Sequence, residues 1–294
     1  MGFLFAFLSA LFFTLNSMFL KKGMRASEKD NGVFMSIIVN VMVLGLAWPV
    51  YRLLTHDAGQ PTFNGILFLV LAGVCTTFFG RSMLFAGIRR VGPSRAVALK
   101  NTAPVFSLLF AVLILNEAYG IWPWAGLMLI FAGLGLQGLQ LFHRSESKID
   151  RLGLLFAVMA AVGFGIGQGF RKQGIIHFDD PFAGAFIGAM VALVSFSISE
   201  MIRGDFIELV KSNLRFQNKF YVWSGLMTSM ALLSFFISLQ YIHVAYASAI
   251  AAVEPVLTVI FSKIFLKAEE EINPQVIAVS VFIFMGAGVI AFTG

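Results

Sequence analysis

Three charged residues lie inside otherwise apolar stretches of the chain. Arg81 lies seven residues before one stretch ends near Ile88, and Lys100 lies seven residues after the next begins near Pro93. In helical form each would be roughly 10 Å deep, measured from the same membrane face. Two cations at one depth predict a shared anion such as a carboxylate or phosphate, because a charge left in lipid costs at least about 2.5 kcal/mol. The alternative is that both side chains snorkel to the interface.

Glu254 is the third of these charges and the only acidic residue well inside an apolar stretch. A carboxylate in hydrocarbon either finds a partner or takes up a proton. Three roles therefore stay open: binding a substrate ammonium, carrying a coupling proton, or forming an ion pair with Arg81 or Lys100. Glu117 and Glu200 lie at the ends of stretches, where we expect solvent to reach them.

Uncharged polar residues in the apolar stretches complete the candidate site. We expect Asn16, Asn40 and Gln168 to shape a cavity, although such residues also join transmembrane helices at about 0.6 kcal/mol each. No histidine lies inside a stretch, and the four histidines lack metal-ligand spacing. With one buried carboxylate and no convergent nucleophile and base, we predict no enzyme, no cofactor and no metal.

Composition places these residues in a membrane. The chain is 59% hydrophobic and 12% charged, with a mean hydropathy of +0.87, whereas soluble proteins are about 25% charged. The basic residues lie mostly between apolar stretches, where they report orientation and contact with anionic lipids, so we exclude nucleic-acid binding. We predict an all-α integral membrane protein, multi-pass, in a bacterial inner (plasma) membrane.

The sequence contains an internal repeat. A shift of 151 positions carries Gly2 onto Gly153, Pro104 onto Pro255 and Pro123 onto Pro274. Each copy holds five stretches long enough to span a bilayer, and an odd number makes the second copy enter from the opposite side. We therefore predict ten transmembrane helices as two inverted five-helix repeats, residues 1–142 and 153–294, joined by a linker at 143–152. The ten segments are 2–21, 33–54, 65–88, 94–115, 120–141, 153–172, 181–202, 219–240, 245–266 and 273–292.

Two further patterns bear on these segments. Most of the 21 lysines and arginines follow odd-numbered segments, and only Arg52, Arg171 and Lys172 follow even-numbered ones. The positive-inside rule then places both termini outside the cell. Glycines occupy every second position from 163 to 169 in the sixth segment, and we expect them to permit close helix contact.

Stretches around the two matched prolines resemble the drug/metabolite transporter superfamily, particularly its EamA-type members. These stretches are Ala249-Ile-Ala-Ala-Val-Glu-Pro-Val and Thr102-Ala-Pro-Val-Phe, with Leu115-Asn-Glu-Ala118 and Trp124-Ala-Gly126 downstream. The resemblance implies a carrier or exporter with a central cavity between the copies. Ala103 departs from the glutamate that the family often carries there. Lys100 is similar to the lysine with which phosphate translocators of the superfamily hold phosphate, and many EamA-type members are described with both termini cytoplasmic.

These observations predict a secondary active transporter of a small polar metabolite, anionic or zwitterionic and bearing a carboxylate, as an amino acid does. Alternating access with proton or exchange coupling would drive it, since the chain carries no ATP-binding signature. The alternative is an organic-phosphate exchanger. A lipid flippase or a passive channel is a less favoured alternative. Expected substrate-binding residues are Arg81, Lys100, Glu254, Asn16, Asn40 and Gln168, and the expected partners are that small molecule and membrane lipids.

Overall fold

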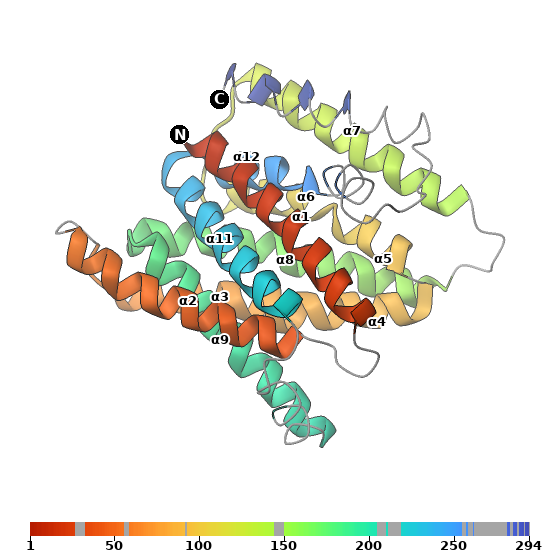
Figure 1. Cartoon of the computed structure of the whole chain (residues 1–294). Helices are drawn as coiled ribbons and strands as arrows, with labels where there is room; N and C mark the ends of the chain where they lie inside the picture. Colours follow the sequence, from red (N-terminus) through yellow and green to blue (C-terminus); the bar gives the residue numbers. More distant parts are fainter. Residues whose placement is uncertain are drawn as a thin grey trace.

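The computed structural model describes residues 1–26, 33–55, 59–91, 93–143, 150–204, 210 and 219–254, with 257, 261, 281–282, 285–286, 288–290 and 292–293 in the last part of the chain. Its regular elements in this part are all helices, as predicted (Figure 1). They are α1 (Gly2–Ala26), α2 (Val33–Leu54), α3 (Phe63–Gly73), the π-helix η1 (Val74–Gly80), α4 (Arg81–Val91), α5 (Pro93–Lys100), α6 (Ala103–Leu113), α7 (Ile121–His143), α8 (Arg151–His177), α9 (Pro181–Arg203), α11 (Lys219–Tyr241) and α12 (Val244–Ala251).

Six apolar helical stretches among the described residues are long enough to cross a membrane. They are Gly2–Leu20, Phe34–Leu54, Phe63–Val91, Arg151–His177, Pro181–Ile202 and Lys219–Tyr241, with shorter apolar helices at Ala103–Leu113 and Ile121–Leu136. The predicted ninth segment begins with α12, and more than half of the tenth lies outside the described residues. The count of ten crossings therefore stays a prediction.

The predicted fourth segment is broken in the middle. α5 ends at Lys100, a turn follows, and α6 begins with Pro104 in its first turn. Proline has no N–H, and its ring clashes with the carbonyl oxygen four residues earlier, which here belongs to Lys100. The turn is held by backbone bonds from Asn101 to Val97 at 2.9 Å and from Thr102 to Leu99 at 3.0 Å.

The second copy repeats this break in the same register. Ala252 donates to the carbonyl oxygen of Ser248 at 3.1 Å, and Val253 to that of Ile250 at 3.0 Å, which are the bonds of the first copy shifted by 151 positions. α12 ends at the turn, and Glu254 is the first helical residue beyond it. The duplication therefore extends to the interruption of the helix and not only to its composition.

The closest packing joins helices from different copies. α1 lies along α11, while α8, the counterpart of α1, lies along α3, η1 and α4 (Figure 1). At the start of α1, an added Cβ on Gly2 would lie 2.7 Å from Ile242, and near the end of α8 the Lys172 ammonium donates to the Ile242 carbonyl oxygen at 3.1 Å. α1 therefore begins where α8 ends, and the two run in opposite directions, as in an inverted repeat.

The bundle has two ends, which we call the Gly2 end and the Val91 end. The Gly2 end holds the start of α1, the end of α8 and the start of α9. The Val91 end holds the start of α8, where an added Cβ on Gly153 would lie 2.7 Å from Val91. Because α4 ends at Val91, it runs from the interior of the bundle toward this second end.

Glycines let α8 lie against two helices at once. An added Cβ on Gly163 would lie 3.0 Å from the carbonyl oxygen of Cys75 in η1, whereas one on Gly165 would lie 2.6 Å from that of Ala103 in α6. Residues two positions apart on a helix point to nearly opposite sides. The alternating glycines therefore face different neighbours, and these contacts are the close ones that the sequence predicted.

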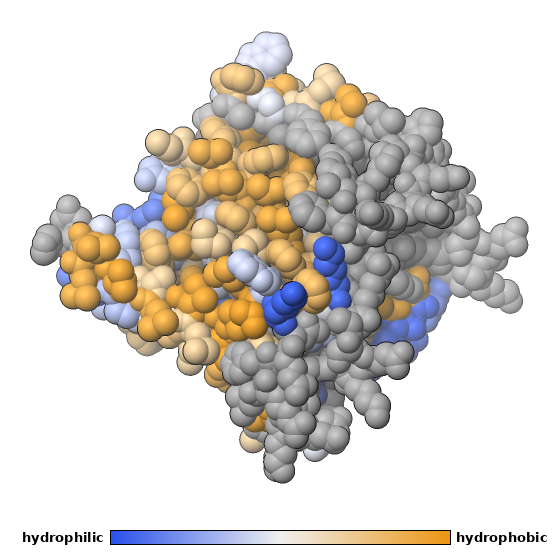
Figure 2. Space-filling view, in the orientation of Figure 1, coloured by the Kyte–Doolittle hydropathy of each residue, from blue (hydrophilic) through white to orange (hydrophobic). Residues whose placement is uncertain are grey.

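The outer surface of the bundle is apolar. In Figure 2 the coloured part of the face in view is mostly hydrophobic, with a few hydrophilic residues among it. Large side chains such as Leu46 and Leu53 are 69% and 79% exposed. A soluble protein rarely exposes so broad an apolar patch, but lipid tails cover one without cost. The described part of the chain is therefore that of a multi-pass integral membrane protein.

Candidate functional site

Five of the six predicted site residues line one cavity of about 270 Å³ inside the bundle. They come from five places in the chain: α2, α4, α5, α8 and the position directly after the turn that ends α12. The first copy contributes Asn40, Arg81 and Lys100, and the second contributes Gln168 and Glu254. We call this space the central cavity.

The two broken helices position the charges of the central cavity. Lys100 is the last residue of α5, and Ala103 and Pro104 at the start of α6 also line the cavity. Ala252 and Glu254 occupy the corresponding break of the second copy. Irregular backbone at membrane depth is tolerated where it lines a cavity, and discontinuous helices form substrate sites in many transporters.

A π-helical stretch positions Arg81. The predicted third segment changes from α3 to η1 over Val74–Gly80 and back to α4 at Arg81. Thr76 and Thr77 of η1 line the central cavity, and the Thr76 hydroxyl donates to the Ala72 carbonyl oxygen at 2.8 Å. Such widened turns are rare and occur often at functional sites.

Arg171 also lines the central cavity, and its predicted position in a loop is wrong. In the charge count of the sequence, Arg171 and Lys172 belong to the loop after the sixth segment, 153–172, but α8 continues to His177. The guanidinium of Arg171 donates to the Gln168 amide oxygen at 3.3 Å, and its carbon lies 5.7 Å from the ring centre of Phe235 and 5.5 Å from that of Phe236. These aromatic faces stabilise the cation without neutralising it.

Lys100 and Glu254 have weak partners in the cavity. The Lys100 ammonium lies 5.7 Å from the ring centre of Phe164, and the Ser17 hydroxyl donates to the Glu254 carboxylate at 3.4 Å. Among the described residues, no ion pair within 4.0 Å joins Glu254 to Arg81 or Lys100. The predicted alternative of an internal ion pair is therefore absent from this conformation.

The two asparagines have different surroundings. Asn40 is 3% exposed and lines the central cavity, and its amide oxygen accepts a hydrogen bond from the Ser229 hydroxyl at 2.8 Å. Asn16 does not line the cavity. Its amide oxygen accepts from the Ser224 hydroxyl at 2.6 Å, where α1 packs on α11. Asn16 thus joins two helices in this structure, the alternative role of such residues.

The cavity carries more positive than negative charge. Arg81, Lys100 and Arg171 face a single carboxylate, that of Glu254, so an anion or the anionic group of a zwitterion is favoured there. Ser248 adds a hydroxyl that is buried and has no hydrogen-bond partner in the described part of the chain. A buried hydroxyl costs free energy until it is bonded. It is therefore available to a molecule in the cavity.

Glu117 belongs to a cluster that joins the copies at the Gly2 end. Its carboxylate accepts a hydrogen bond from the Tyr119 hydroxyl at 2.5 Å and lies 3.3 Å from His243 Nδ1 in the second copy. Burial by itself would raise the pKa of Glu117, but the hydrogen bonds from His243 and Tyr119 and the charges of His243 and Lys172 lower it below its ordinary value.

A second contact joins the copies at the same end. Asp180 of the second copy is fully buried, and its carboxylate accepts from the Trp48 indole at 2.9 Å and from Arg52 at 3.2 Å. The same carboxylate group caps α9 by accepting from the Ala183 N–H at 2.9 Å. The Gly2 end is therefore held by polar contacts between the copies.

Two acidic residues lie deeper than the sequence suggested. The Glu117 side chain is 8% exposed, and Glu200 is 5% exposed. We expected solvent to reach both because they lie near segment ends. The expectation is wrong because neighbouring side chains cover them, and hydropathy along the chain carries no information about such cover.

The fold and the site together define a class: an all-helical membrane protein built from a repeated unit, with a charged cavity between the copies. The model of the EamA-like transporter family matches residues 1–138 and again 151–292. The chain therefore belongs to that family, which confirms the resemblance found around Pro104 and Pro255 and makes it a membrane transporter of the drug/metabolite type.

A comparison with solved structures agrees with the fold. A solved structure, titled only "Crystal structure of protein", has a TM-score of 0.73 at 15% identity, over 99% of this chain and 97% of that chain. At this identity the likeness shows the fold alone. A comparison with curated proteins finds no significant match.

Proposed function

We propose that this protein is a secondary active transporter of a small polar metabolite that bears a carboxylate, as an amino acid does. The observation that carries the proposal is the central cavity, where three cations and one carboxylate meet between the copies. Arg81, Lys100 and Arg171 would bind the carboxylate of the substrate. Glu254 would bind an ammonium group or carry a coupling proton. Asn40 and Gln168 would orient the remaining polar groups.

A second candidate substrate is an organic phosphate, and Arg171 favours it. A carboxylate has two oxygens and one negative charge, whereas a phosphate monoester has three free oxygens and close to two charges. Three cations around one cavity match the second ligand better than the first. An amino acid would use Glu254 in addition, while a phosphate would be repelled by it unless Glu254 is protonated.

Alternating access would carry the substrate across the membrane. The polar contacts at the Gly2 end would separate the cavity from that side in the present conformation. Rocking of one copy against the other would break them and close the opposite side. Proton or exchange coupling would supply the energy. The full architecture would be ten crossings in two inverted copies, with the Val91 end in the cytoplasm by the positive-inside rule, in a bacterial inner membrane.

Purified protein in liposomes tests this function. A thermal-shift screen against amino acids, organic acids, sugar phosphates and amines first finds the ligand, because a molecule that binds the folded state raises the apparent melting temperature. Uptake of the ligand should then saturate and show counterflow. Flux that rises without saturation would indicate a passive channel, and movement of labelled lipid without uptake of soluble ligand would indicate a flippase. Either result contradicts the proposal.

A further inference from the structure

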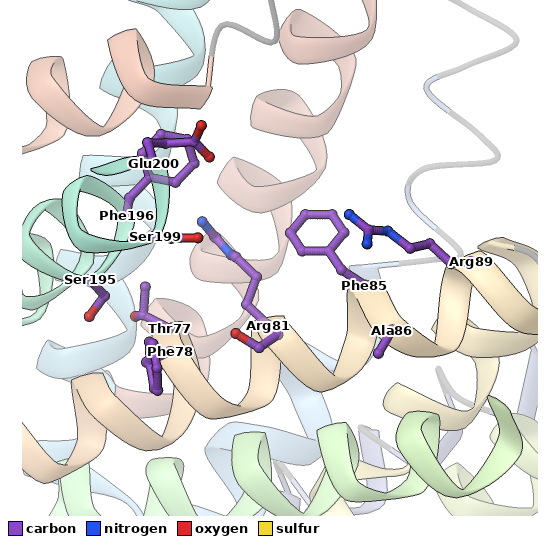
Figure 3. Close-up of a pocket in the computed structure, with 11 residues that line it drawn as sticks. Thr77, Phe78, Arg81, Phe85, Ala86, Arg89, Ser195, Phe196, Ser199 and Glu200 are labelled. Carbon is purple, nitrogen blue, oxygen red and sulfur yellow. The ribbon is translucent and has the colours of Figure 1, made fainter. Parts of the chain in front are cut away.

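A second hollow lies beside the central cavity and shares Thr77 and Arg81 with it. This outer pocket has a volume of about 180 Å³ and lies between α4 and α9. Figure 3 shows Arg81 and Arg89 projecting from α4 on the same side, with Arg81 directed toward Ser199 of α9. The two arginines are eight residues apart, which is roughly 12 Å along a helix. Arg89 lies two residues before the Val91 end.

The chemistry of the outer pocket is that of a water-filled space. Hydroxyls from both helices line it, among them Ser82 of α4 and both Ser195 and Ser199 of α9. Its rim includes Phe85, which is 51% exposed. A lipid tail entering the pocket would suit this ring but would leave Arg81 and three hydroxyls in hydrocarbon. Charged residues inside membrane segments normally face water or a partner, so polar solutes suit this pocket better than an acyl chain.

The net positive charge increases from the outer pocket to the central cavity. The outer pocket holds Arg81 and Arg89 against Glu200, and the central cavity holds Arg81, Lys100 and Arg171 against Glu254. A small anion at the Val91 end would meet Arg89 first, then Arg81. From Arg81 it would pass to the larger positive charge beyond. A cleft of one sign with low-dielectric walls attracts counter-ions and speeds their arrival.

We propose that the outer pocket is a second binding site for small organic anions, through which the substrate passes between the Val91 end and the central cavity. The inference rests on the proposed transport function, and Arg81 is the residue that belongs to both sites. The ligand class is a free anion in water, with a carboxylate or phosphate group. A lipid headgroup is the competing occupant that the experiment must separate.

Charge-selective thiol labelling tests the outer pocket directly. The chain has one cysteine, so Cys75→Ser gives a background without thiols. In that background, Ser199→Cys places a thiol in the pocket. Its neighbour Ile198→Cys, 47% exposed and absent from the pocket lining, is the matched control. The reagents are a methanethiosulfonate with a sulfonate group and one with a trimethylammonium group. The modification rate of each reagent with the protein thiol is divided by its rate with free 2-mercaptoethanol.

We expect the anionic reagent to modify Ser199→Cys faster than the cationic one, by roughly tenfold, because Arg81 and Arg89 attract one and repel the other. Adding Arg89→Gln should lower this preference several-fold. Adding Arg90→Gln should not, because Arg90 points elsewhere and pairs with Asp150 at 3.1 Å. Ile198→Cys should show no preference for the anionic reagent.

Two results would overturn the inference. A Ser199→Cys thiol that neither reagent modifies would mean a pocket filled by lipid or protein, and equal rates unaffected by Arg89→Gln would mean a pocket without anion selectivity. If Ser199→Cys does not purify as a folded protein, Ser195→Cys in the same pocket is read by the same criteria. Labelling needs no transport, so failure here is distinguishable from a failure of the transport proposal, which liposome uptake reports.

Discussion

Replacing Gly165 with alanine should destabilise the protein through the contact between α8 and α6. The new Cβ would lie 2.6 Å from the Ala103 carbonyl oxygen and 2.9 Å from the Ser107 nitrogen. These are backbone atoms, so no rotamer change relieves the overlap. Restoring ordinary contact at 3.4 Å requires the helices to separate by roughly 0.8 Å, and overpacking of this kind costs about 1–3 kcal/mol.

Gly188→Ala is the matched control, because nothing lies within 4 Å of a Cβ at that position of α9. There alanine should stabilise the helix by up to about 1 kcal/mol. The two variants should therefore differ by about 1–4 kcal/mol, or roughly 2 °C or more in apparent melting temperature, measured in detergent by intrinsic fluorescence. Equal melting temperatures for both variants would refute the close packing of α8 on α6.

Three other outcomes follow from the site and from the Gly2 end. Arg171→Gln should weaken ligand binding by about 1.5–3 kcal/mol, about tenfold or more in Kd. Arg151→Gln, at the exposed start of the same helix, should leave the Kd unchanged. Equal Kd values for the two variants in ligand titrations would remove Arg171 from the site. Glu254→Gln should abolish any pH dependence of exchange in liposomes, and a surviving pH profile would mean that it carries no coupling proton. Because the pKa of Glu117 is lowered in the folded protein, its contribution to stability is present above the ordinary value of 4.5 and is lost as pH falls through the folded pKa. Wild type should therefore lose more apparent melting temperature than Glu117→Gln between pH 6 and pH 4, and parallel losses would contradict the pairing with His243.

Hydropathy and local signals predicted the continuous helices well. The seventh predicted segment, 181–202, matches α9 because Asp180 caps the helix and Pro181 occupies its first turn. The π-turns of η1 could not be predicted, since their residues are as apolar as those of the flanking α-helix. The break at Pro104 was visible as a proline, but an averaged hydropathy window passes over one residue and joined α5 to α6.

Comparison of the copies predicted much of the charged lining of the central cavity. In the repeat, Arg81 corresponds to Leu232 and Lys100 corresponds to Ala251. Both Arg81 and Lys100 line the central cavity. Arg171 stands opposite Leu20 by the same register. It was missed because it was counted with the loop after the sixth segment, whereas α8 continues to His177.

A difference between the copies is nonetheless no proof of a cavity residue. Asn16 stands opposite Gly167 in the repeat, yet Asn16 bonds to Ser224 between two helices. Gly167, for its part, permits the close approach of α8 to Thr76. Differences between the copies therefore mark both cavity-lining residues and unequal helix contacts. Only the packing tells them apart.

The symmetric breaks explain how opposite charges are tolerated in one cavity. Lys100 lies at the carboxyl end of α5, where the helix dipole is negative, and Glu254 lies directly after the turn that ends α12. The end of α5 favours the Lys100 charge by about 0.3–1 kcal/mol, and more where burial reduces screening. An unbroken helix would offer neither end at this depth. The repeated break thus places the ends of α5 and α12 beside the cavity, and each copy carries a different charge next to its break.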